Sequence, residues 1–298
     1  DGEVTITQDS SAPDGFANSL KVDVTSADDS LSASQLAFLE YNVEAQDLQR
    51  LAFGTSSAKN FTLSFYVKSN KTGTYAVNIS QNDNSSKQAT LNYTINSANT
   101  WERKSLTFTG DTSGVINDDN GIGFLVYWVL AVGSTFTSGG STSATFQTYA
   151  NANLGAGHAV NLLDDTANEW FITGVQLEVG QNETSFEHEP FERTLAKCQR
   201  YYEILGAVAS TNSMAGTVTV GQDIAGRKTI GPYFYKTEKR AAPTIANLSI
   251  GIDAGDTTHS FVFSTGTRST SGSSTTSTDI GEADGLEGDF NILVDAEM

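Results

Sequence analysis

The sequence is poor in several residue types, and each shortage excludes a class of protein. Its 298 residues include one cysteine, Cys198, so neither an intrachain disulfide framework nor a cysteine-rich zinc site can form. Only three histidines are present, which leaves little room for a histidine-based metal site. The longest apolar run, Ile122 to Val132, is interrupted by Gly123 and is about half as long as a bilayer-spanning helix.

Positive charge is scarce as well. Lys and Arg number 17 against 35 Asp and Glu, which gives a formal net charge of −18 at pH 7. Such a surface repels phosphate backbones and anionic lipid headgroups, so we expect no nucleic-acid binding and no membrane insertion. The hydrophobic share of 38% is enough for a core and argues against a disordered chain.

Short runs of alternating apolar and polar residues dominate the first 190 residues. In Phe61–Ser69, for example, every second residue is apolar, and clusters of Asn, Asp, Gly and Ser separate such runs. This pattern is typical of antiparallel strands. Phe124–Val132 is apolar on both faces, which predicts a central strand. About eight strands at short spacing predict a jelly-roll β-sandwich over residues 1–190. Further alternating runs are Ser19–Val24, Tyr75–Ile79, Leu91–Ile95, Trp101–Thr109 and Trp170–Glu178, the last with a slip at Gly174 that predicts a bulge.

Residues 191–205 break the β pattern. Apolar residues recur there at spacings of four and three, which predicts an amphipathic helix that begins after Pro190. These residues are Phe191, Leu195, Cys198, Tyr202 and Leu205. Two interpretations stay open: the helix lies against the sandwich, or it forms a short self-association seam. Cys198 is expected to be a buried, small apolar residue.

The remaining residues, 206–298, have a weaker β pattern and predict a small C-terminal β domain. Gly266–Ser277 is a Ser/Thr/Gly tract with almost no apolar residues, which predicts a long, mobile loop. The expected fold is therefore all-β: a sandwich (1–190), a connecting helix (191–205) and a small β domain (206–298). The candidate strands of the last domain are Thr217–Val220, Tyr233–Tyr235, Ile245–Ile252, His259–Phe263 and Asn291–Val294.

The sequence gives little evidence for a catalytic or metal-binding site. Adjacent acidic pairs are expected by composition alone, and sequence neighbours cannot flank a scissile glycosidic bond, so we predict no catalytic residues, no cofactor and no enzyme activity. Asp111, Asp118 and Asp119, with Asn120, form the densest cluster of oxygen ligands. Their spacing matches no known calcium loop, so a structural calcium and a solvated acidic turn both stay open.

Sugar recognition needs an aromatic platform beside polar side chains. Tyr149 lies in a polar stretch with Asn151 nearby and is the aromatic residue least easily explained by a core. Trp101 is a second candidate, although it opens a strand and would equally well cap the core. Tyr127 lies on the strand that is apolar on both faces and is expected to be buried. Glycan contacts are therefore predicted at Tyr149, Asn151 and Trp101, or in the Gly266–Ser277 tract.

Several segments resemble one protein family along almost the whole chain. Trp170–Gly180 reads WFITGVQLEVG, Thr184–His188 reads TSFEH and Cys198–Tyr202 reads CQRYY. These segments are similar to phage tail-fibre and related virion structural proteins that contain a jelly-roll domain like that of carbohydrate-binding modules. Asn99–Glu102 and Val294–Met298 carry further similarity, whereas Ser185 replaces a usual proline.

The resemblance implies a virion protein, most specifically the distal part of a tail fibre or spike that attaches to a host-surface glycan. It also implies a homotrimer, with other virion proteins bound through an N-terminal region that precedes Asp1. Two alternatives stay open: a carbohydrate-binding module of a polysaccharide-degrading enzyme, and a decoration protein or fibre on the capsid.

Overall fold

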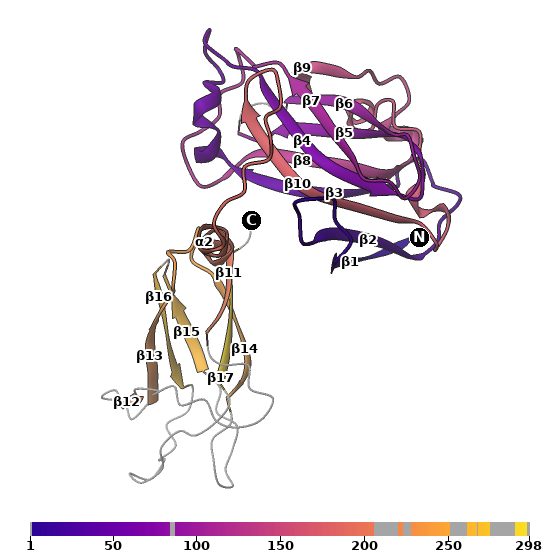
Figure 1. Cartoon of the computed structure of the whole chain (residues 1–298). Coiled ribbons are helices and arrows are strands. Elements are labelled where there is room, and N and C mark those ends of the chain that lie inside the picture. The colour runs from indigo at the N-terminus through magenta and orange to yellow at the C-terminus, as the bar shows by residue number, and fades with distance from the viewer. Residues whose placement is uncertain are drawn as a thin grey trace. The chain divides into compact units, whose positions relative to one another are not determined.

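The computed structural model describes residues 2–83, 87–205, 220–222, 228–250, 261–266, 268–274 and 290–296 (Figure 1). The chain divides into two compact units, Asp1–Glu187 and His188–Met298. In both units the named strands pair antiparallel, which confirms the all-β fold. Within the described ranges, no helix has the length and apolar character needed to cross a membrane.

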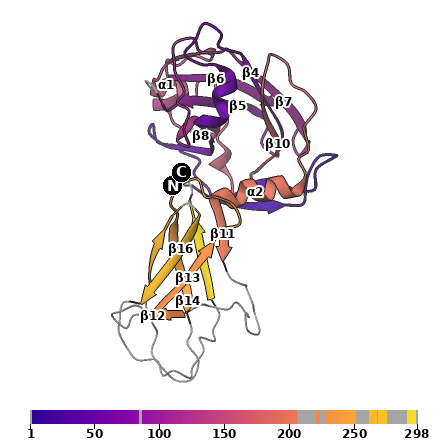
Figure 2. The ribbon, with the colours of Figure 1, turned by 90° about the vertical axis from the view of Figure 1, so that its left-hand side faces the viewer.

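Unit 1 is a jelly-roll sandwich of two five-stranded sheets, which Figure 2 shows facing one another. The strand order is β1-β2-β10-β4-β7 in the first sheet and β3-β8-β5-β6-β9 in the second. The first sheet consists of β1 (Glu3–Asp9), β2 (Ser19–Ser26), β10 (Glu169–Val179), β4 (Phe61–Ser69) and β7 (Glu102–Phe108). The second consists of β3 (Leu36–Glu44), β8 (Ile122–Val132), β5 (Gly73–Gln81), β6 (Lys87–Ile95) and β9 (Ser143–Thr148). Short helical turns connect them: η1 (Ala45–Leu51), η2 (Ser134–Phe136), α1 (Asn151–Leu154) and η3 (Leu162–Asp164).

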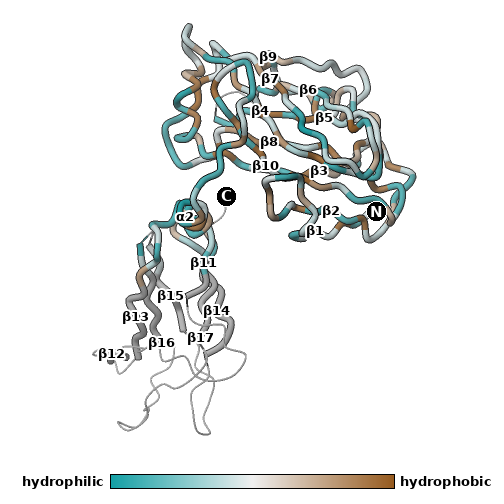
Figure 3. Tube along the Cα trace, viewed as in Figure 1, coloured by the Kyte–Doolittle hydropathy of each residue, from teal (hydrophilic) through white to brown (hydrophobic). Residues whose placement is uncertain are grey.

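The core lies between the two sheets and is rich in aromatic rings. The inward residues of β4 and β5 are the apolar members of the alternation seen in the sequence, and Figure 3 shows hydrophobic stretches along the strands. Phe61 is fully buried and stacks on Phe108, with ring centroids 5.2 Å apart. Burying one such ring contributes about 1.5–3 kcal/mol, so the aromatic cluster is a large part of the sandwich's stability.

Three strands of unit 1 were not predicted: β1, β3 and β9. Each lies at an edge of its sheet, where a strand has one neighbour and need not bury a continuous face. The predicted bulge is confirmed, because the β10–β4 register shifts between Thr173 and Gln176. Gly174 has a φ of 59°, and a Cβ there would come within 2.6 Å of Phe16 Cζ, so this position requires glycine.

Unit 2 contains α2 (Phe191–Tyr201) and two small sheets, ordered β11-β17-β14 and β12-β13-β16-β15. The helix is four residues shorter than predicted, because Tyr202–Leu205 pairs with β17. Cys198 is exposed, so its expected burial is wrong. The strands are β11 (Tyr202–Leu205), β12 (Val220–Gln222), β13 (Lys228–Phe234), β14 (Thr244–Ile250), β15 (Phe261–Thr265), β16 (Ser269–Ser274) and β17 (Phe290–Asp295).

The Gly266–Ser277 tract is not a single loop, and that prediction is wrong. Ser269–Ser274 forms β16, which pairs with β13 and β15. Backbone groups alone supply the ladder hydrogen bonds, so a strand can form without apolar side chains when it has a partner on each side. Residues 267 and 275–277 of the tract lie outside the described residues, as do 217–219, 251–252 and 259–260 of the predicted strands.

Candidate functional site

The face of the second sheet that points away from the core carries a row of buried polar side chains. On β5, Asn78 and Ser80 alternate with Val77 and Ile79, which belong to the core. Asn78 is fully buried, although it lies on the outer side of the sheet. A buried amide needs hydrogen-bond partners, and the neighbouring strand β6 supplies them.

A hydrogen-bond network joins β5, β6 and the segment that follows β9. Nδ2 of Asn78 donates to Oε1 of Gln88 at 2.9 Å and to Oγ1 of Thr90 at 2.7 Å. Nε2 of Gln88 then donates to the backbone oxygen of Ala150, and Oγ1 of Thr90 to that of Asn153, both at 2.7 Å. The polar face of the sheet therefore holds the loop that begins at Tyr149.

A pocket of about 200 Å³ opens beside this network. Tyr127 from β8 and Tyr149 from the loop after β9 contribute its aromatic part, and Tyr149 is 39% exposed. The lining residues are Ser80, Gln81, Asn82, Leu125, Tyr127, Tyr149 and Leu154, none of which carries a formal charge. A neutral pocket with two tyrosines and polar side chains suits a ligand that stacks and forms hydrogen bonds.

Tyr127 is held in a fixed environment. Its ring makes an edge contact with Phe38 of β3 at a centroid distance of 4.8 Å. Burial, together with the nearby carboxylate of Glu40, raises the pKa of Tyr127 to about 12. The hydroxyl therefore stays protonated at neutral pH and can donate a hydrogen bond.

The structure separates the three predicted glycan contacts. Tyr149 lines the pocket, whereas Asn151 is exposed on α1 and is not among the lining residues. Trp101 immediately precedes β7, in the other sheet, where its ring contacts Phe171 at a centroid distance of 6.2 Å. Trp101 therefore belongs to a different face of the sandwich from Tyr149 and does not cap the core.

The predicted metal ligands are not brought together either. Asp111 is 6% exposed, and both of its carboxylate oxygens accept hydrogen bonds from Lys87 Nζ, at 2.8 and 2.9 Å. Burial opposes ionisation of this carboxyl, but the hydrogen bonds from Lys87, Ser113 and Gln81 outweigh it and lower the pKa to about 2. Asp118 and Asp119 are exposed. Over the described residues, no group of three or more His, Cys, Asp or Glu side chains could hold a metal ion, and structural calcium stays a prediction.

Sequence reasoning missed the polar lining of the pocket. Ser80 and Asn82 line the pocket with Tyr127, which was expected to be buried but is half-buried. One signal was present: Asn78 and Ser80 alternate with Val77 and Ile79, which places two polar groups on one face of the strand. The contact with Tyr149 had no sequence signal, because it depends on how the loop after β9 returns to β5.

Comparisons with known proteins give weak structural similarity only. No protein-family model matches the chain, and no curated protein matches it. A putative sugar-binding protein from Bacteroides thetaiotaomicron is 15% identical, with a TM-score of 0.34, over 60% of this chain and 84% of that one. A family 11 carbohydrate-binding module of a Clostridium thermocellum cellulase is 12% identical, with a TM-score of 0.33, over 62% and 86%. The enzymatically active domain of tailspike protein 4 from bacteriophage CBA120 is 14% identical, with a TM-score of 0.32, over 60% of this chain and 18% of that one. Similarity at this level transfers no function to this chain.

Proposed function

We propose that unit 1 binds a glycan in the pocket between Tyr127 and Tyr149. The observation that supports this proposal is the composition of the pocket: two tyrosines stand beside Ser80 and Asn82, with no charged side chain in the lining. Aromatic rings stack on the apolar faces of sugars, and neutral polar groups bind sugar hydroxyls. The ligand we expect is therefore an uncharged stretch of a polysaccharide.

We further propose that the chain is a virion protein, located in the distal part of a phage tail fibre or spike that attaches to a host surface. The support is the family resemblance of Trp170–Gly180 and Cys198–Tyr202. We also predict no catalytic activity for the chain, which fits a protein that attaches to a surface. The alternative readings, a module of a polysaccharide-degrading enzyme or a capsid decoration protein, would share the pocket but differ in where the protein is found.

A homotrimer is part of the same proposal, and α2 is the segment we assign to it. Phe191 and Leu195 are 76% and 41% exposed, and no residue of this 11-residue helix is buried. Two backbone contacts hold its last turn: Ala296 N donates to Tyr201 O at 2.7 Å and Arg240 N to Arg200 O at 3.2 Å. So short a helix is marginal alone in water, and packing against the same stripe of other copies would stabilise it. Several copies would also combine weak glycan contacts into avid binding.

The experiment is a glycan array probed with the full chain, followed by competition of the bound glycan against phage adsorption. We expect binding to neutral oligosaccharides that Tyr149→Ala abolishes. Mass spectrometry of purified phage particles tests the location. A chain that binds glycans but is absent from particles would support the module of a degrading enzyme, and a chain that binds no neutral glycan would contradict the proposed pocket.

A further inference from the structure

The outer face of the first sheet carries a row in which cations and aromatic rings alternate. Phe171 of β10 lies directly opposite Lys21 of β2 on one side and Lys68 of β4 on the other. On the far side of Lys68, the β4–β7 register pairs Val67 with Glu102, which places Trp101 next in the row. We call Lys21, Phe171, Lys68 and Trp101 the cation–aromatic row.

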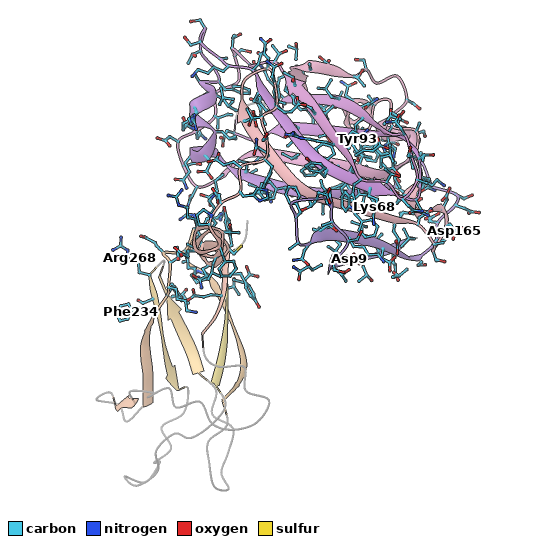
Figure 4. The ribbon with its side chains drawn as sticks, in the orientation of Figure 1. Asp9, Lys68, Tyr93, Asp165, Phe234 and Arg268 are labelled. Atoms are coloured by element: carbon cyan, nitrogen blue, oxygen red, sulfur yellow. The ribbon has the colours of Figure 1, made fainter. Side chains whose placement is uncertain are left out.

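The side chains of the row are in contact. Lys68 Nζ lies 3.9 Å from the ring centroid of Phe171 and 5.4 Å from that of Trp101. Lys21 Nζ lies 5.7 Å from the Phe171 centroid. Figure 4 labels Lys68 among the side chains of the sandwich. A cation over an aromatic face is attracted by the ring's quadrupole, so the ammonium of Lys68 is held in place by two rings.

The two lysines differ in their charge partners. Lys21 forms ion pairs with Glu169 and with Asp23. Lys68 is absent from the ion pairs of the described residues, and its ammonium donates to the hydroxyl of Ser11 at 2.6 Å. This is unexpected in a chain with 35 acidic and 17 basic residues, where carboxylates are plentiful.

A purely structural role explains only part of the row. Phe171 is 4% exposed although it lies on the outer face, and lysine stems commonly cover such a ring. Covering a ring does not require a charge, however, and a methionine would cover Phe171 without one. A purely structural role also does not explain Trp101, whose half-buried indole continues the row to the edge of the sheet.

We propose that the cation–aromatic row binds a sugar that carries a carboxylate, as in an acidic polysaccharide. The Lys68 ammonium takes the carboxylate, and the indole of Trp101 stacks on the sugar ring. This surface is separate from the pocket at Tyr149, so one sandwich has a neutral site on one sheet and an acid-selective site on the other.

The net charge of −18 does not prevent such binding. At ~0.15 M ionic strength the Debye length is about 8 Å, so exposed carboxylates farther away than this are largely screened. The contact between Lys68 and a bound carboxylate is shorter than that length and is screened much less. Glu169 and Asp23 pair with Lys21 and lie within this length of the row, which leaves Lys68 as the cation of the row without an acidic partner among the described residues.

The test titrates the full chain with oligogalacturonate and with its methyl ester, which has the same sugar rings but no charge. Trp128 and Trp170 are 2% and 0% exposed, so iodide quenching of fluorescence reports chiefly on Trp101. We expect oligogalacturonate to protect Trp101 from iodide. We also expect Lys68→Met, which keeps the stem over Phe171, to weaken binding about tenfold or more, because a hydrogen bond to a charged group is lost.

Lys59→Met is the matched control, since it removes the same charge from an exposed lysine outside the row and should leave the affinity unchanged. Equal affinity for the acid and its ester, or no effect of Lys68→Met, would overturn the proposal. So would a lack of oligogalacturonate binding by the wild-type chain. Equally tight binding of polyglutamate would also overturn the proposal, because it would show that the row recognises carboxylates without a sugar. Tyr149→Ala should not affect this titration, which separates failure of the row from failure of the pocket.

Discussion

Asn78 and Thr90 are joined by a hydrogen bond of 2.7 Å from the buried amide nitrogen to the hydroxyl oxygen, and the same hydroxyl donates to the backbone oxygen of Asn153. One small side chain thus connects the sheet to the loop that carries Tyr149. The pocket exists because this loop is fixed to β6, so its shape should be sensitive to Thr90.

Thr90→Val tests this connection, because valine has the same shape but no hydroxyl. The substitution leaves the Asn153 oxygen without its donor and Asn78 with one acceptor fewer, which costs about 1–3 kcal/mol of unfolding free energy. Urea unfolding followed by circular dichroism measures the loss. Thr94→Val, at an exposed position on the same strand, is the control. Equal stability of the two variants would contradict the role given to Thr90.

Tyr149 should contribute to glycan binding through its ring and not through its hydroxyl. We expect Tyr149→Phe to keep the affinity for a neutral oligosaccharide within about threefold, whereas Tyr149→Ala removes the stacking surface and lowers it about tenfold or more. Isothermal titration measures both. Tyr41→Ala alters an exposed tyrosine outside the pocket and should have no effect. If Tyr149→Phe lowers the affinity as much as Tyr149→Ala does, the hydroxyl is the main contact and the expectation is wrong.

Most of the sandwich could be predicted from the sequence because its interior strands must bury one face or both. Phe61–Ser69 and Phe124–Val132 have that constraint, and both are strands close to the predicted bounds. Glu3–Asp9 has no such constraint, because it is an edge strand with six exposed residues. Its pairing with β2 rests on backbone hydrogen bonds, which leave no pattern in the sequence.

The candidate site was only partly predictable, for a related reason. Trp101 and Tyr149 were both recognised as available aromatics, but which sheet face each one joins depends on strand order, which alternation does not reveal. The charge count concealed a second feature. A net charge of −18 does not show where on the surface the cations lie. Lys21 and Lys68 flank Phe171 only because β2 and β4 are both neighbours of β10.

His158 should make the sandwich less stable in acid. Its Nδ1 accepts a hydrogen bond from the Ala76 N–H at 3.1 Å, and its Nε2 contacts the backbone oxygen of Val160 at 2.5 Å. Burial lowers the pKa of His158 to about 4, from about 6.5 in an unfolded chain. Between these values the unfolded state binds a proton that the folded state does not. Stability should therefore fall as the pH drops from about 6.5 to 4, by at most about 1.4 kcal/mol per pH unit.

Unfolding midpoints in urea, measured from pH 8 to pH 4, test this expectation. His158→Gln removes the titrating ring, so its stability should be lower at pH 7 but should vary less between pH 6.5 and 4. Carboxylates with lowered pKa values, such as Asp111 and Glu102 at about 2, lose their stabilising contribution only below about pH 4. The same slope in wild type and variant would assign the acid sensitivity to another group.

Lys87 should be essential for keeping Asp111 buried. Lys87→Met leaves a carboxylate that is 6% exposed without its cation, and breaking such a pair costs about 3–5 kcal/mol. Thermal unfolding measures the change, and Lys59→Met controls for the lost charge. Because an ammonium already neutralises Asp111, EDTA should leave the wild-type midpoint unchanged. A lower midpoint in EDTA would contradict this and would support the predicted structural calcium.

The exposed stripe on α2 should control the oligomeric state. Phe191→Asp places a carboxylate in the stripe, where burial against other copies would desolvate it, so we expect the trimer to dissociate into monomers. Light scattering coupled to size-exclusion chromatography, at several protein concentrations, measures the mass. Phe234 on β13 is 72% exposed and points away from the ribbon (Figure 4), so Phe234→Asp is a control of equal chemistry in the same unit. If both variants keep the wild-type mass, or if the wild-type chain is itself a monomer, α2 is not the seam. A trimer lost in Phe191→Asp alone would place the contact on the helix, because the two substitutions add the same charge at similarly exposed phenylalanines.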